Sequence, residues 1–279
     1  MIPFVRRFVA GTHSEEALDA VHHLNEDGLK ATLDYLGEEC RNKEQAAASA
    51  REIENTLRLL NAANLDSNVS LKLTQLGFNL DEDLARGHLE RILDKAAEYG
   101  NFIRLDMEGS GYTQKTLDLF HRVFETRKNV GVVIQAYLKR SAADIEALIK
   151  AGARVRLCKG AYKEPAQVAL QDKEEINRSY DALARRLLER GNYPGIATHD
   201  DGRIAAAEKA VKELGLSKDK FEFQMLFGVR RKRWLELAGQ GYNVRIYVPY
   251  GTHWFPYYYR RIRERKENLV FALRSVWGD

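Results

Sequence analysis

The sequence has few cysteines, no long apolar run and no large excess of charge of either sign. Its only two cysteines, Cys40 and Cys158, are too few for a disulfide framework and are typical of a reducing cytosol. No apolar stretch reaches the roughly 18 residues of a membrane-spanning helix, so none is expected. Lys plus Arg is 44 and Asp plus Glu is 40, and this near balance does not call for a nucleic-acid partner.

Several binding motifs are absent as well. No Gly-x-Gly-x-x-Gly follows the first predicted strand and no phosphate-binding P-loop is found, so neither type of nucleotide site is expected. Histidine, cysteine and carboxylate side chains are not clustered as metal ligands, and no metal site is predicted. No Pro-rich or Ser-rich linker divides the chain. With its length of 279 residues, this favours one α/β domain over residues 1–279.

Short apolar runs alternate with segments of helical period along the whole chain. The eight runs lie at 29–39, 69–77, 102–110, 130–137, 154–162, 195–200, 221–226 and 244–251. They are rich in Val, Ile, Leu and Tyr, as buried parallel strands are. Eight alternating strand and helix units in a chain of this size predict a (β/α)8 barrel of the TIM type.

The segments between the runs have apolar residues three, four and seven positions apart, which is typical of amphipathic helices. Predicted helices include 13–27, 171–190, 202–214, 229–239 and 256–275, and four others are marked by apolar stripes within 53–60, 89–96, 117–124 and 145–149. Two capping boxes are predicted at helix starts, Thr12 with Glu15 and Ser141 with Asp144.

Polar side chains stand at the ends of the predicted strands, where barrels of this type place their active sites. The ring consists of Lys72, Asp106, Gln135, Arg156, Lys159, His199, Gln224 and Tyr247. Cations and amides dominate this ring, and they would repel a divalent metal ion. They suit an anionic, hydrogen-bonding organic ligand such as a flavin dinucleotide. Glycine at position 160 lets the backbone approach such a ligand closely.

The last predicted helix has an unusual polar stripe. Tyr257, Arg260, Arg261 and Glu264 are spaced so that they share one face, close behind the eighth strand. Two adjacent guanidinium groups suit a small carboxylate, because each can donate two parallel hydrogen bonds. The alternative is an exposed stripe in which Arg260 pairs with Glu264.

Lys72 lies in an otherwise apolar strand, and a buried lysine almost always has a partner. Asp106, at the equivalent end of the next strand, is the predicted partner. Three interpretations remain open at this point. The pair is a structural ion pair in the barrel mouth, or it forms a wall of a polar substrate pocket, or Lys72 is a Schiff-base nucleophile.

Taken together, the motifs resemble those of the proline dehydrogenase family, the flavin-dependent barrels that oxidise L-proline. Eight motifs occur in order over nearly the whole chain: Leu71-Lys72-Leu73, Arg104-Leu-Asp106-Met-Glu108, Gln135-Ala-Tyr137, Arg156-Leu-Cys-Lys159-Gly160-Ala161-Tyr162, Ala197-Thr198-His199, Phe223-Gln224-Met-Leu226, Arg245-Ile-Tyr247-Val-Pro249 and Tyr257-Tyr-Tyr-Arg260-Arg261. The resemblance implies FAD as cofactor, proline as substrate and Δ1-pyrroline-5-carboxylate as product. Since no aldehyde dehydrogenase domain follows, the monofunctional bacterial form is expected.

The resemblance also implies roles for individual residues. Arg260 and Arg261 would bind the proline carboxylate, and Glu38 would pair with Arg260 as a gate over the substrate; the alternative is a solvated Glu38, with Glu39 or Glu264 as the partner. The proline ring would be enclosed by Lys72, Asp106, Ala161, Tyr162, Leu226, Tyr247 and Tyr257. FAD would be bound by Gln135, Arg156, Lys159, Gly160, Ala161, Thr198, His199 and Gln224, with Arg156 near N5. Arg156, Lys72 and Asp106 would be the catalytic residues.

Partners and location are implied by the resemblance too. A quinone is the expected electron acceptor, with the protein in the cytoplasm or in peripheral contact with the inner face of the cell membrane. A separate pyrroline-5-carboxylate dehydrogenase would act on the product, and no nucleic acid is involved. Members of the family often carry an additional N-terminal helical arm. The sequence departs from this pattern at its N-terminus, so the oligomeric state and the removal of such an arm are both left open. Two other functions remain as alternatives: a Schiff-base aldolase that uses Lys72, and a barrel that binds an amino acid without turnover.

Overall fold

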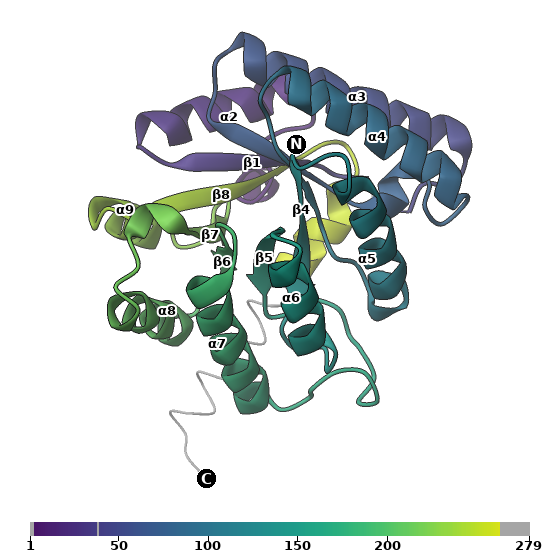
Figure 1. The fold of residues 1–279 in the computed structure, drawn as a ribbon. Coiled ribbons are helices and arrows are strands. Elements are labelled where there is room, and N and C mark those ends of the chain that lie inside the picture. Colours follow the sequence, from purple (N-terminus) through teal and green to yellow (C-terminus); the bar gives the residue numbers. More distant parts are fainter. Residues whose placement is uncertain (1–2, 38, 263–279) are drawn as a thin grey trace.

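The computed structural model describes residues 3–37 and 39–262, and within them the chain forms a closed barrel of eight parallel strands in sequence order (Figure 1). The predicted barrel is thereby confirmed. Each predicted run contains or overlaps one strand. The strands are β1 Lys30–Tyr35, β2 Ser67–Leu71, β3 Ile103–Leu105, β4 Val130–Gln135, β5 Arg154–Cys158, β6 Gly195–Ala197, β7 Glu222–Leu226 and β8 Asn243–Tyr250.

Helices surround the barrel, with α2, α3 and α4 along one side and α7 and α8 on the opposite side (Figure 1). They are α1 Pro3–Arg6, α2 Ser14–Glu26, α3 Lys43–Ala62, α4 Glu82–Glu98, α5 Ser110–Phe124, α6 Ser141–Lys150, α7 Lys173–Arg190, α8 Asp201–Glu213 and α9 Arg231–Gly239, with 3-10 turns η1 Leu73–Leu76 and η2 Lys218–Lys220. A further helix begins at 255 and continues to 262, the last described residue. The remainder of the helix predicted over 256–275 lies outside the described residues. No helix in the described part is both long enough and apolar enough to cross a bilayer.

Both predicted capping boxes are wrong. Helix α2 begins one residue later than the Thr12 box requires, so Glu16 and not Glu15 occupies the third helical position. Glu16 accepts hydrogen bonds from the Thr12 amide (2.7 Å) and hydroxyl (3.2 Å). Ser141 is already the first residue of α6, and its hydroxyl donates to the carbonyl oxygen of Gln135 (2.6 Å). Spacing alone therefore identified helix starts, but not the residues that cap them.

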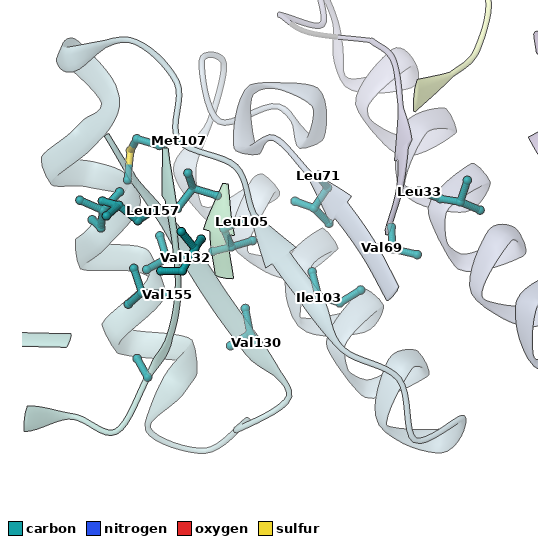
Figure 2. Close-up of a cluster of buried hydrophobic side chains, with 14 of the residues drawn as sticks. Leu33, Val69, Leu71, Ile103, Leu105, Met107, Val130, Val132, Val155 and Leu157 are labelled. Atoms are coloured by element: carbon teal, nitrogen blue, oxygen red, sulfur yellow. The ribbon is translucent and has the colours of Figure 1, made fainter. Parts of the chain in front are cut away.

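The two faces of each strand differ in chemistry. The outward side chains are mostly apolar and join the helices in one large buried cluster. Figure 2 labels Leu33, Val69, Leu71, Ile103, Leu105, Val130, Val132, Val155 and Leu157 among them, together with Met107, which follows the end of β3. Successive strand residues point to opposite faces, so the residues between them face the barrel interior. Many of those inner residues are charged. Arg156 on β5, for example, contacts Asp106 beyond β3 and Gln224 on β7. Contacts between strands that are not neighbours are possible only across the interior.

Glycine makes room for one of these inner charges. A Cβ atom on Gly131 would lie 2.6 Å from Nη1 of Arg104 and 2.5 Å from the carbonyl oxygen of Arg154. Nη1 of Arg104 donates to that same carbonyl oxygen at 2.6 Å, so neither atom can move aside without losing this hydrogen bond. The side chain of Arg104 fills the space that a larger residue on β4 would need.

We expect Gly131→Ala to lower the free energy of unfolding by about 1–3 kcal/mol, the usual effect of overpacking. Urea denaturation measures it. Gly87→Ala is the matched control, because a Cβ atom on this helical glycine of α4 would meet nothing within 4 Å. The control should be neutral or stabilising by about 0.5–1 kcal/mol. Equal changes in the two variants would contradict the steric role of Gly131.

Candidate active site

A buried ion pair lies at the C-terminal mouth of the barrel. Nη1 of Arg156 donates to Oδ1 of Asp106 at 2.7 Å, and Nε of Arg156 donates to the side-chain oxygen of Gln224. The hydroxyl of Tyr247 donates to the other oxygen of Asp106, also at 2.7 Å. The guanidinium carbon of Arg156 lies 5.4 Å from the centre of the Tyr247 ring. Four of the predicted site residues therefore form one rigid network across the barrel.

Lys72 joins this network through a residue that the sequence did not single out. Its Nζ lies 3.2 Å from Oδ2 of Asp34 on β1 and 3.9 Å from Oδ2 of Asp106. The predicted contact with Asp106 is present, but Asp34 is the nearer partner. Burial raises the pKa of the fully buried Asp34 to about 6, although the positive charge of Lys72 acts to lower it. An aspartate at an inward position of the first predicted strand was the signal that could have revealed it.

A second buried ion pair, between Glu222 and Arg245, orients the side chain of Gln224. The amide nitrogen of Gln224 donates to Oε1 of Glu222 at 2.5 Å. Arg245 on β8 donates from Nε to both oxygens of Glu222, at 2.9 and 3.0 Å. Burial acts to raise the pKa of Glu222, but the guanidinium of Arg245 lowers it overall. Since Glu222 accepts from the amide nitrogen, the amide oxygen of Gln224 is left facing Arg156. No role was predicted for Glu222 or Arg245.

His199, beyond the end of β6, is held as a neutral imidazole. The backbone amide of Leu226 donates to its Nε2 at 3.2 Å, which places the ring proton on Nδ1. Burial lowers the pKa of His199 to about 4, helped by the positive charges of Arg261 and Arg230. Nδ1 is buried and has no hydrogen-bond partner among the described residues. His199 therefore offers a donor at the barrel mouth.

The remaining predicted cofactor residues lie at the same end of the barrel. Nζ of Lys159 donates to Asn177 at 2.6 Å and to Asp200 at 2.7 Å. The Thr198 hydroxyl accepts from the backbone amide of Asp200 at 3.1 Å. Gly160 has a φ of 125°, a conformation that other residues rarely adopt. No sequence signal pointed to Asn177 or Asp200 as partners of Lys159: Asn177 lies on α7, 18 residues further on, and Asp200 follows the next strand, β6.

The loop after β5 carries Ala161 and Tyr162 and is fixed by several hydrogen bonds to the rest of the barrel. The amide of Ala161 donates to Oε1 of Gln135 at 3.4 Å. Further along, Glu164 accepts from the backbone amide of Ser110 at 2.7 Å and from its hydroxyl. Ser110 is the first residue of α5, so Glu164 caps that helix and keeps the loop at the barrel mouth.

The final helix begins close behind β8, as predicted. Tyr257 is buried in a small cluster with Val5, Phe8, Val9 and Leu36, and Tyr247 packs against the edge of this cluster. Arg260 and Arg261 are half-buried, and the guanidinium of Arg261 lies 5.2 Å from the centre of the Tyr257 ring. Glu38, the predicted gate, and Glu264 lie outside the described residues.

The site thus combines buried cations, oriented amides and a neutral histidine at one end of a (β/α)8 barrel. Within residues 3–37 and 39–262, no three His, Cys, Asp or Glu side chains are grouped to hold a metal ion. The barrel fold and the polar side chains at the C-terminal ends of its strands place the protein in the class of (β/α)8-barrel enzymes, whose active sites lie at those strand ends.

Comparison with known proteins defines the family. A family model described as proline dehydrogenase matches residues 17–274. "Proline dehydrogenase 1" of Bacillus subtilis (strain 168) is 43% identical over 271 residues, which cover 97% of this chain and 90% of the relative. "Proline dehydrogenase" of Deinococcus radiodurans is 40% identical over 275 residues, covering 97% and 89%. The chain belongs to the proline dehydrogenase family, and it is therefore an oxidoreductase; the family predicted from its motifs is confirmed.

The fold agrees with a solved structure of a larger protein. Proline utilization A (PutA) from Bdellovibrio bacteriovorus, inactivated by N-propargylglycine, superposes with a TM-score of 0.86 at 25% sequence identity. The match covers 92% of this chain but 32% of the PutA chain. The similarity thus corresponds to one barrel within PutA.

Proposed function

We propose that this chain, as a single domain over residues 1–279, catalyses the FAD-dependent oxidation of L-proline to Δ1-pyrroline-5-carboxylate. This is the first step of the catabolism of proline to glutamate. The observation that carries the proposal is the buried Arg156 at the barrel mouth, fixed on one side by Asp106 and on the other by Gln224. Its remaining nitrogen, Nη2, is buried without a hydrogen-bond partner among the described residues, so a donor and a positive charge remain for a ligand.

The donors of the site fit a flavin dinucleotide. Nη2 of Arg156 and Nδ1 of His199 are both buried N–H groups in need of acceptors, and a flavin ring and a diphosphate supply such acceptors. Gln135 and Arg156 would lie beside the isoalloxazine; Lys159, Gly160, Ala161, Thr198, His199 and Gln224 would hold the rest of FAD. When bound, FAD would accept the hydride from the ring carbon next to the proline nitrogen. The fixed charge of Arg156 would stabilise the negative charge that develops near N5.

The substrate would lie between the network and the last helix. Arg260 and Arg261 would bind the carboxylate, and the ring would be enclosed by Lys72, Asp106, Ala161, Tyr162, Leu226, Tyr247 and Tyr257. Two carboxylates lie within 4.0 Å of the Lys72 ammonium and favour its charged form, which is not a nucleophile. This geometry favours Lys72 as a pocket wall over the Schiff-base alternative. Arg156, Lys72 and Asp106 are the proposed catalytic residues.

The gate and the partners also remain proposals. Glu38 would pair with Arg260 over the bound substrate and open for exchange, since a partly exposed ion pair contributes only about 0–1 kcal/mol. A quinone would accept the electrons. The protein would lie in the cytoplasm or in peripheral contact with the inner face of the cell membrane. A pyrroline-5-carboxylate dehydrogenase would act on the product.

The proposed function is tested by the visible spectrum of the purified, FAD-reconstituted protein. We expect flavin absorbance bands that bleach when L-proline is added without oxygen, because reduction of the flavin removes those bands. D-proline, whose carboxylate points to the other side of the ring, is the matched control and should bleach them far more slowly. Bands that stay oxidised in excess L-proline would rule out the function.

The same preparation distinguishes the two alternatives. A Schiff-base aldolase would be colourless, and borohydride would inactivate it in the presence of its substrate through a covalent bond to Lys72. A barrel that only binds an amino acid would also lack a flavin spectrum, but borohydride would not modify it.

A further inference from the structure

Asp34 is the most deeply buried charged group of the barrel mouth. It lies on β1 with no exposed surface, and its two oxygens are 3.2 and 3.5 Å from Nζ of Lys72. Lys72 itself is only 7% exposed. A carboxylate in such a place is destabilising unless an opposite charge is held against it.

The position of Lys72 affects the ion pair beside it. Its ammonium stands between Asp34 and Asp106, 3.2 Å from the first and 3.9 Å from the second. Asp106 already accepts from Arg156 and from Tyr247, each at 2.7 Å. If Asp34 lost its charge, Asp106 would be the nearest remaining carboxylate to Lys72 in the described part of the chain, and Lys72 would compete there with Arg156 and Tyr247. Asp34 therefore determines whether Asp106 remains available to them.

The two partners differ in stiffness. Asp34 has a short side chain on a strand paired on both sides, opposite Ser70 of β2 and Pro249 of β8. Lys72 follows the end of β2 and carries its charge on a flexible four-carbon stem. The aspartate is therefore the fixed member, and the lysine takes its position from it.

We propose that Asp34 is a positioning residue of the reaction, which holds the Lys72 ammonium in the pocket wall and so leaves Asp106 to Arg156 and Tyr247. The inference rests on the proposed function, because that function assigns Lys72 and Asp106 to the substrate pocket. No motif that carried the family resemblance includes Asp34.

The protonation of Asp34 agrees with this role. Among the described residues, Lys72, Asp106 and Tyr247 are the charged or titratable groups that act on it, and burial raises its pKa to about 6. The charged form that holds Lys72 is therefore present above about pH 6 and is lost below it. The rate of flavin reduction should fall as the pH drops through this value.

The experiment is a double-mutant cycle of Asp34→Asn and Lys72→Met on the rate at which saturating proline reduces the enzyme-bound flavin. We expect Asp34→Asn to lower this rate about tenfold in the wild-type background and less than about twofold when Lys72 is already methionine. The fall in the reduction rate below about pH 6, the acid limb of the pH profile, should be present in the wild type and missing in Asp34→Asn, because asparagine does not titrate. Ser70→Ala is the control: Ser70 is equally buried opposite Asp34, and it should leave both the rate and the limb unchanged.

Folding is followed by the urea midpoint of the same variants. Lys72→Met leaves Asp34 buried without its ammonium, so the double variant should be more stable than Lys72→Met alone. If the urea midpoint of the double variant is as low as that of the less stable single variant, Asp34 and Lys72 are not an ion pair. If proline bleaches the wild type but the effects of the two substitutions on the reduction rate are additive, the role of Asp34 is overturned and the proposed function stands. A wild type that proline does not bleach overturns the proposed function, and the role of Asp34 with it.

Discussion

Replacing Arg156 with methionine is expected to lower the free energy of unfolding by about 3–5 kcal/mol, the usual cost of breaking a buried ion pair from one side. The variant leaves the Asp106 carboxylate buried with Tyr247 as its nearest donor and Lys72 at 3.9 Å. It also removes the positive charge proposed to stabilise the reduced flavin. We therefore expect a lower flavin reduction potential, slower turnover or weaker FAD retention in the same variant.

A second ion pair of the same length provides the control. Nε of Arg127 donates to Asp94 at 2.7 Å, the same distance as from Nη1 of Arg156 to Asp106, but Asp94 is 60% exposed. Arg127→Met should lower the free energy of unfolding by only about 0–1 kcal/mol and leave the flavin unaffected. Urea denaturation and potentiometry make the comparison. An unchanged potential with normal turnover and normal FAD content in Arg156→Met would reject its place beside the flavin.

The barrel could be predicted from the sequence because its signals are local. Most strands lie in short runs rich in branched or aromatic residues, and the helices repeat their apolar residues with the period of one turn. The first and last residues of each strand and helix could not be predicted as well, because they depend on more than this local pattern. The second run was expected to begin at 69, but β2 spans Ser67–Leu71 and ends where Lys72 starts a 3-10 turn. Apolar periodicity does not register the hydrogen bonds that terminate an element.

The contacts inside the barrel could not be predicted in the same way. Asp106 binds Arg156, 50 residues further on, and Tyr247, 141 residues further on. Barrel closure brings these strands face to face, and no local spacing tells which inward side chains will meet. The sequence did indicate that each residue stands at a strand end. The predicted partner of Lys72 was Asp106, at the end of the next strand along the chain. Asp34 was missed, although β1 also pairs with β2 and its carboxylate is the nearer one.

Arg260→Met and Arg261→Met are each expected to raise the KM for proline strongly while the fold is retained. Both side chains are half-buried beside the barrel mouth, so their loss removes little packing. The loss of a charged hydrogen-bond donor to a carboxylate weakens binding by roughly 2–4 kcal/mol, which is about thirtyfold to a thousandfold. Arg231→Met is the matched control, because that side chain is 68% exposed on α9 and pairs with Asp27. Steady-state kinetics with L-proline would measure the three variants.

Arg261 has a second, independent readout that tests its position without any substrate. Burial and then the charge of Arg261 hold the pKa of His199 at about 4. Removing a neighbouring positive charge favours the protonated imidazole, so Arg261→Met should raise the pKa of His199, and Arg231→Met should not. NMR titration of the histidine ring follows this shift. If the pKa rises but KM changes by less than about threefold in both arginine variants, the last helix lies where the structure places it and the carboxylate binds elsewhere.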